Sequence, residues 1–284
     1  MKAILTHPGS SHKDDLLACC LLIFKHSVPV WRREPTAEDL DDPEIVVVDV
    51  GGEHEPARQN FDHHQFPRDH EPICALSLVL KDMGLYDDAR SFCEWLEPAE
   101  WFDTRGPFAT AKWLGVERGV INKLNSPIDI TLLRRFAQKS ELKQGDPIWE
   151  FMRMIGEDLV MFLKTLRERV DYVAGHAEFL TVGEGDDAVT ILYMARNESM
   201  TDDPSSGLGR YIDSTGKKVD GLIYPDRRGA GYGLSRHEDS PKLDFTQITD
   251  EPDVHFAHAR GFVAKTTATD LDRLKDLVDM ARSK

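Results

Sequence analysis

The chain has 284 residues and carries 50 acidic against 35 basic side chains, a formal net charge of −15. This charge argues against electrostatic binding of long duplex nucleic acid, although a short single strand or a small phosphorylated ligand at a local positive site stays open. No apolar run approaches the roughly 20 residues of a membrane span, and no signal-peptide core forms before His7 and Pro8. We therefore expect a cytoplasmic protein without membrane contact, and its four cysteines, which form no CxxC pair, indicate buried thiols.

The N-terminal half has the pattern of an α/β fold. Residues 3–7, "AILTH", predict a buried strand, and the helix "DDLLACCLLIFKH" follows after a Pro-Gly turn. "PVWRR" is a candidate second strand, and the β-branched run "EIVVVDV" is typical of a parallel sheet covered on both faces. Apolar residues at helical spacing recur in four later segments: "ICALSLVLKDMGLY", "ARSFCEWLEPAEWF", "PFATAKWLGVERGVI" and "ITLLRRFAQ".

The pattern changes after a long amphipathic segment at residues 146–174, which we expect to be a connecting helix. Short strand-like pieces follow: "FLTVG", "AVTILYMA", "DGLIYPD", "AGYGLSR" and "VHFAHARGFVA". "NESMTDDPSSGLG" indicates a mobile loop, and "TDLDRLKDLVDMAR" a closing helix. The predicted organisation is an α/β parallel-sheet domain over residues 1–125, a helical connector over 126–176 and a smaller C-terminal α+β domain over 177–284.

Side chains of metal-ligand type gather in three motifs of the first half. They are His7, His12 and Asp14 in "THPGSSHKDD", Asp49 in "VVVDVGG", and Asp62, His63 and His64 in "NFDHHQ". Each motif alone also reads as a strand cap, a helix start or a surface turn. Parallel sheets, however, bind ligands beyond the carboxyl ends of their strands, so His7 and Asp49 are expected at one rim. Nitrogen and oxygen donors together suit Mn²⁺, Fe²⁺, Co²⁺ or Zn²⁺, and the lack of sulfur disfavours a structural zinc site.

In this order and with short gaps, the three motifs resemble the DHH phosphoesterase superfamily, most closely the MYG-type metal-dependent hydrolases and 3′–5′ exonucleases. The resemblance covers roughly residues 1–103 and is weak beyond. It implies a DHH-type catalytic domain that binds two divalent ions. Mn²⁺ is the preferred ion, and Co²⁺, Fe²⁺, Zn²⁺ and Mg²⁺ are the alternatives. By motif, one ion would be bound by His7, His12 and Asp49. The other would be bound by Asp14, Asp49, His63 and Asp103 of "EWFDTRGP", with Glu97 and Glu100 as competitors for the last position.

The resemblance also implies roles for residues around the ions. Asp62 would orient a liganding histidine, and His64 would meet the substrate. In the superfamily a C-terminal domain closes over the metals, and "GYGLSRH" and "HFAHARGF" are the best matches here. Residues 205–265 contain nine basic and nine acidic side chains, so these charges balance in this segment, whereas the whole chain has a net charge of −15. The candidate phosphate contacts are Arg236, His258, Arg260 and Lys265, with ordinary strand-surface charges as the alternative.

Two divalent ions would outweigh three aspartates, so the site could receive a phosphate. Ions roughly 3.5 to 4 Å apart activate a water and neutralise the charge that builds on phosphorus. We therefore expect a metal-dependent phosphodiesterase, a 3′–5′ exonuclease on short single-stranded RNA or oligonucleotides. The alternatives are a small-molecule phosphatase or pyrophosphatase and a catalytically weak nucleotide-binding regulatory module. A homo-oligomer is also left open.

Overall fold

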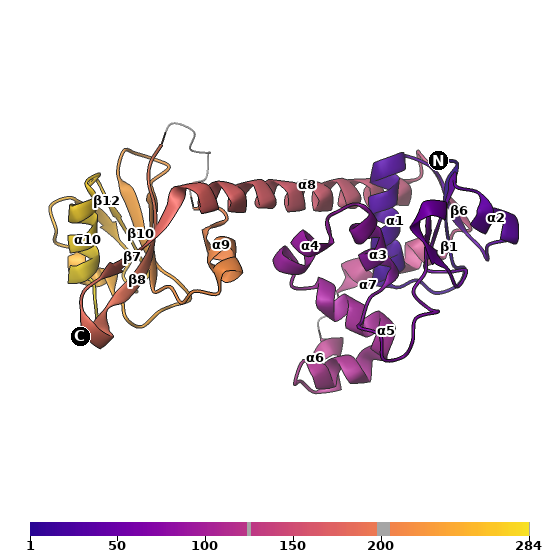
Figure 1. The fold of residues 1–284 in the computed structure, drawn as a ribbon, viewed down its shortest axis with the longest axis horizontal. Coiled ribbons are helices and arrows are strands. Elements are labelled where there is room, and N and C mark those ends of the chain that lie inside the picture. Colours follow the sequence, from indigo (N-terminus) through magenta and orange to yellow (C-terminus); the bar gives the residue numbers. More distant parts are fainter. Residues whose placement is uncertain (124–125, 198–204, 284) are drawn as a thin grey trace. The chain divides into compact units, whose positions relative to one another are not determined.

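The computed structural model describes residues 1–123, 126–197 and 205–283. It divides into two compact units, Met1–Thr165 and Leu166–Lys284 (Figure 1). The division falls within the long helix α8 (Pro147–His176), inside the segment expected as a connector, and the three-part boundaries stay a prediction. No helix in the described part of the chain is long and apolar enough to cross a membrane. Of the expected mobile loop, residues 198–204 lie outside the described residues.

The first unit is built on a six-stranded sheet with the strand order β4-β5-β3-β1-β2-β6. Its strands are β1 (Ala3–Thr6), β2 (Val30–Arg32), β3 (Ile45–Val48), β4 (His54–Glu55), β5 (Asn60–Phe61) and β6 (Glu141–Leu142). β1 pairs in parallel with β2 and β3, and β3 pairs in parallel with β5, which agrees with the β-branched pattern of the sequence. The edge strands β4 and β6 run antiparallel to their neighbours. At two residues each, they are too short to leave a pattern in the sequence.

Helices α1 (Lys13–His26), α2 (Ala37–Asp41) and α3 (Ala75–Asp82) contact the strands of this sheet. The first unit also contains α4 (Tyr86–Phe92), α5 (Leu96–Trp113), α6 (Arg118–Asn122) and α7 (Pro127–Ala137) (Figure 1). All residues of β1 and β3 are buried, as expected for strands covered on both faces. On one face Leu5 and Val47 pack with Leu40 of α2. Full burial of each such side chain stabilises the fold by about 1.5 to 3 kcal/mol.

The first part of α8 crosses α1 at close range. A Cβ atom built on Gly156 would lie 2.1 Å from the carbonyl oxygen of Cys20. Any larger residue would push the two backbones apart, so glycine is required here. The contact places α1, and therefore the loop that leads into it, against a long helical support.

The second unit is a second six-stranded sheet, with the order β11-β12-β10-β9-β8-β7. Its strands are β7 (Ala177–Val182), β8 (Val189–Met194), β9 (Gly221–Pro225), β10 (Tyr232–Arg236), β11 (Val254–Ala257) and β12 (Val263–Thr266), and its short helices are α9 (Leu208–Thr215) and α10 (Leu271–Met280). Only the pair β8–β9 is parallel among the strand pairs of this described sheet. The piece expected as one strand, "VHFAHARGFVA", forms both β11 and β12, because the chain turns at Gly261 with φ +69°.

Candidate metal centre

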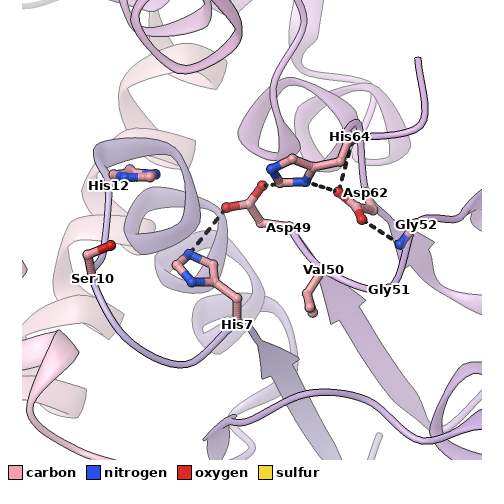
Figure 2. Close-up of a pocket in the computed structure, with 9 residues that line it drawn as sticks. All are labelled: His7, Ser10, His12, Asp49, Val50, Gly51, Gly52, Asp62 and His64. Carbon is pink, nitrogen blue, oxygen red and sulfur yellow. Dashed lines mark hydrogen bonds and ion pairs between the residues drawn. The ribbon is translucent and has the colours of Figure 1, made fainter. Parts of the chain in front are cut away.

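His7 and Asp49 follow β1 and β3 directly, and these strands pair in register at Thr6 and Val48. Their side chains therefore emerge at one rim, with His7 Nε2 3.5 Å from Asp49 Oδ2. Figure 2 shows the Asp49 carboxylate between the His7 and His64 rings. Asp49 has φ 58°, in the left-handed region, which costs a residue with a side chain roughly 1 to 2 kcal/mol. Such strain at a buried carboxylate is common at functional sites.

β5 lies beside β3 and leads into the "DHH" segment. His63 is buried, and its Nε2 atom lies 3.1 Å from Asp49 Oδ1 and 2.9 Å from Asp103 Oδ2. Burial lowers the pKa of His63, but Asp103 and Asp49 outweigh it and raise the pKa to about 10. In the metal-free protein this imidazole therefore holds a proton between two carboxylates.

Asp14 lies in the first turn of α1 and is 2% exposed. Within the described residues, neither of its carboxylate oxygens has a hydrogen-bond partner. Burial, followed by the charges of Asp49 and Asp103, raises the pKa of Asp14 well above its usual range. An unpaired buried carboxylate is unfavourable, and a cation beside it would remove the cost.

The structure brings together all six residues expected as metal ligands, in two overlapping groups. The groups are His7, His12 and Asp49, and Asp14, Asp49, His63 and Asp103, and within each group the ligand atoms lie within 4.8 Å of one another. Asp49 belongs to both. His12 is the most exposed member, at 58%, and its Nδ1 atom lies 3.6 Å from Asp103 Oδ1. The ligand roles themselves stay a prediction.

Glu97 and Glu100, the competitors of Asp103, are engaged elsewhere. The buried Glu100 carboxylate accepts hydrogen bonds from Ser77 Oγ (2.7 Å), the Tyr86 hydroxyl (2.8 Å) and Arg90 Nη1 (3.0 Å). Glu97 pairs with the same arginine at 3.2 Å. Glu100 therefore ties α5 to α3 and α4, one turn before Asp103 enters the cluster.

Asp62 differs from its expected role. Its Oδ1 atom accepts a hydrogen bond from His64 Nδ1 at 2.6 Å, and Oδ2 accepts one from the Gly52 amide at 2.6 Å (Figure 2). Burial raises the pKa of Asp62, but these donors outweigh it and lower the pKa to about 2. Asp62 reaches His63 only through its backbone amide, at 2.7 Å. The oriented ring is thus His64, which is 62% exposed, and not the expected ligand His63.

Sequence reasoning missed two residues that hold the loop between the histidines of the first motif. Arg32, buried at the end of β2, donates hydrogen bonds to the carbonyl oxygens of His7, Gly9 and Ser10. Asp15 Oδ1 accepts a hydrogen bond from the His12 amide at 2.7 Å, and its Oδ2 lies 3.2 Å from His7 Nε2. The Asp15 carboxylate raises the pKa of His7 to about 9. The capping position of Asp15, three residues after His12, was the available signal.

In the second unit the candidate phosphate contacts fall into two places. Arg236 donates to the carbonyl oxygen of Arg260 at 3.2 Å, and the Arg260 amide donates to His258 Nδ1 at 3.1 Å, so these three lie together. Lys265 pairs in the sheet with Gly233, nearer the start of β10 than Arg236, and its Nζ atom lies 2.9 Å from Asp226. The structure therefore does not gather the four into one group.

The N-terminal part of this arrangement is similar to known proteins. Residues 3–75 match the family model MYG1_exonuc, an uncharacterised protein family also called UPF0160. This segment resembles the MYG1 proteins. The MYG1 exonucleases of Homo sapiens and Rattus norvegicus are 41% and 44% identical to it over 64 residues. The MYG1 protein of Chlamydia muridarum is 41% identical over 66 residues.

The MYG1-type match is limited in extent. It spans 21% of this chain and 16% of each mammalian relative, and 22% of both this chain and the Chlamydia relative. It contains His7 to His64 but neither Asp103 nor the second unit. Among solved structures, the pGpG-specific phosphodiesterase PggH from Vibrio cholerae aligns over 98% of both chains at 14% identity. Its TM-score of 0.30 does not establish a common fold.

Proposed function

We propose that the chain is a metal-dependent hydrolase of phosphodiester bonds. It would use two divalent ions, with Mn²⁺ preferred, at the rim of β1, β3 and β5. The observation that carries the proposal is the position of Asp49. Its Oδ2 atom faces His7 at 3.5 Å and its Oδ1 atom faces His63 at 3.1 Å, so one carboxylate serves two ligand groups. A carboxylate that faces both groups could bind both ions and hold them about 3.5 to 4 Å apart, the spacing of two-metal hydrolases. The names of the MYG1 exonucleases, which match the first segment, also support it.

The residues fit a pair of cations by their nitrogen and oxygen donors and by the unsatisfied carboxylate of Asp14. Both Asp14 oxygens are buried and have no hydrogen-bond partner among the described residues, whereas His7 Nε2 and Asp103 Oδ2 lie 3.2 Å from Asp15 and 2.9 Å from His63. Buried polar atoms without partners are rare in folded proteins, and a cation beside Asp14 would satisfy both of its oxygens. His7, His12 and Asp49 would hold one ion, and Asp14, Asp49, His63 and Asp103 the other. When bound, such ions supply Lewis acidity and a water of lowered pKa.

His64 is placed to handle a proton for the leaving group. Its Nδ1 atom bonds the ionised Asp62 carboxylate, which leaves Nε2 for the substrate. Asp62 raises the pKa of His64, so the ring can hold a second proton at Nε2 and donate it toward the leaving oxygen. Positioned acid catalysis of this kind contributes about 10² to 10⁴ in rate.

We propose short single-stranded RNA or oligonucleotides as substrates, shortened from the 3′ end. Arg236, His258, Arg260 and Lys265 of the second unit would contact substrate phosphates. A phosphatase or pyrophosphatase acting on a small molecule is the second candidate, because the rim by itself recognises only a phosphoryl group. An acidic surface outside the site would keep long duplexes away.

The test is hydrolysis by the purified chain with Mn²⁺, over oligoribonucleotides, oligodeoxyribonucleotides, dinucleotides, pyrophosphate and nucleoside monophosphates. We expect stepwise shortening of 5′-labelled oligonucleotides. Asp49→Asn should abolish turnover and lower the bound metal measured by elemental analysis. Asp41→Asn, which alters an exposed carboxylate paired with Arg58, is the matched control and should change neither. Phosphate release from monophosphates alone would support the phosphatase alternative. Binding of these compounds without turnover would support the regulatory module.

A further inference from the structure

A second hollow borders the metal centre on the side of His63 and Asp103. It has a volume of about 260 Å³, and His64 lines both this hollow and the pocket of Figure 2. A substrate that meets His64 therefore has access to both. The outer wall carries aromatic and charged side chains that the metal centre does not use: Phe66, Arg68, His70, Glu71 and Arg105.

The aromatic side chains of this wall form a stack. The rings of Phe66 and His70 lie 4.6 Å apart with an interplanar angle of 24°, and His54 meets Phe66 edge-on at 5.9 Å. His70 is exposed and its described ring partner is Phe66, so another planar ring could stack on it from the solvent side. Stacking of a nucleobase on an aromatic side chain contributes about 1 to 3 kcal/mol and tolerates any base.

The wall is held in place by backbone hydrogen bonds. The Phe66 amide donates to the carbonyl oxygen of His63 at 3.0 Å, and the His70 amide donates to that of Pro67 at 2.9 Å. Arg105 Nη2 donates to the carbonyl oxygen of His70, which ties the loop to α5. The stack therefore has a defined position relative to His63, an expected ligand. Preorganisation of this kind reduces the entropy lost on binding.

The charges of the wall favour a nucleotide over a bare phosphate. Within the part of the chain that the structure describes, the Arg68 guanidinium has no hydrogen bond or ion pair, and it is exposed in the hollow. Glu71 lines the same hollow, so a free phosphate would meet a like charge there as well. A nucleotide avoids this conflict, because an amino group of adenine, guanine or cytosine, or the ring N–H of uracil, can donate to Glu71 while a phosphate reaches Arg68.

We propose that this hollow is a base pocket, formed by Phe66, Arg68, His70 and Glu71, for the nucleoside beside the scissile phosphate. The base stacks on the His70 ring, and a neighbouring phosphate pairs with Arg68. The proposal rests on the proposed function and deepens it, because it makes the substrate a dinucleotide or oligonucleotide and not a small phosphorylated molecule.

The experiment compares Mn²⁺-dependent cleavage of a dinucleotide with that of an abasic dinucleotide, which has the same phosphates and no bases. His70→Ala should raise KM for the dinucleotide roughly 5- to 150-fold, the equivalent of one lost stacking contact, and leave KM for the abasic compound unchanged. His70→Phe should restore the dinucleotide KM, since it keeps a ring. Arg68→Ala should raise KM for both. His176→Ala, which removes a histidine stacked on Tyr172 at 4.2 Å in the second unit, is the matched control.

Equal effects of His70→Ala on the two substrates, or no effect on either, would overturn the base pocket while leaving the hydrolase intact. Absence of Mn²⁺-dependent cleavage of any substrate by the unaltered protein would instead refute the proposed function. The pocket is then judged by calorimetric titration with a nucleoside monophosphate. Weaker binding by His70→Ala than by the unaltered protein supports it, and equal binding overturns it.

Discussion

Asp14→Asn should stabilise the metal-free protein and destabilise the metal-loaded one. The substitution keeps the shape of the side chain and removes its charge. Without metal, that charge is buried, lacks a hydrogen-bond partner among the described residues and lies beside Asp49 and Asp103. With metal, the same charge is one of the expected ligands of the second ion.

The size of the effect follows from the spacing of the cluster. The ligand atoms of Asp14, Asp49, His63 and Asp103 lie within 4.8 Å of one another. Two unit charges at that separation interact by about 3.5 kcal/mol at an effective dielectric constant of 20. Protonated His63 offsets one of the two repulsions on Asp14, and partial protonation of Asp14 itself reduces the other. We therefore expect a gain of roughly 2 kcal/mol, or about 4 to 8 °C in Tm, without metal.

Adding Mn²⁺ should reverse the ranking. A ligand at 100 times its Kd stabilises the native state by about 2.7 kcal/mol, and a variant without a charged ligand loses most of this. The assay is thermal unfolding of both proteins with EDTA and with Mn²⁺. Asp15→Ala is the control, because Asp15 accepts hydrogen bonds from the His12 and Leu16 amides and the loss of this acceptor should destabilise both states. A metal-free Asp14→Asn that is less stable than the unaltered protein would refute the reasoning.

Four further substitutions test other parts of the first unit. His64→Ala should keep its metal and Tm but lose about 10² to 10⁴ in kcat, whereas His63→Ala should lose metal and activity together, and equal metal loss would contradict this split. Glu100→Gln should cost about 1 to 3 kcal/mol and weaken Mn²⁺ binding by loosening α5, so an unchanged Mn²⁺ titration would argue against a positioning role. Arg33 lowers the pKa of Asp39, so this pair stabilises the fold above about pH 4 and the contribution is lost as the pH falls further. Asp39→Asn should therefore cost about 1 kcal/mol at pH 7, with the difference from the unaltered protein disappearing in acid denaturation curves below pH 4.

The sequence was sufficient to place His7 and Asp49 near each other. Both directly follow buried, strand-forming runs, and parallel pairing brings the carboxyl ends of such strands to one edge. Asp103 was harder to choose, because Glu100 lies on the same helix and is equally acidic. The choice depends on tertiary contacts, since the partners of Glu100 come from α3 and α4.

Arg32 was beyond the reach of the sequence for a different reason. Its hydrogen-bond partners are backbone carbonyl oxygens of a loop more than twenty residues earlier, and backbone acceptors leave no side-chain pattern. The same holds for the partner of Asp62. A carboxylate beside two histidines can orient either ring, and only the local turn places His64 Nδ1 against it.

The carboxylates at the rim divide into two kinds, and the division bears on whether the cluster is structural. Asp62 is bonded by His64 and the Gly52 amide, and its pKa is lowered to about 2, as expected for an acid whose charge the fold stabilises. Burial, followed by the charges of Asp49 and Asp103, raises the pKa of Asp14, and burial raises the pKa of Asp49 as well although His63 contacts it. Asp14 has no hydrogen-bond partner among the described residues, whereas buried acids that serve packing alone are usually bonded as Asp62 is. Because the fold buries Asp14 at the expense of its own stability, we expect the missing stabilisation from outside the chain, and divalent cations would supply the opposite charge.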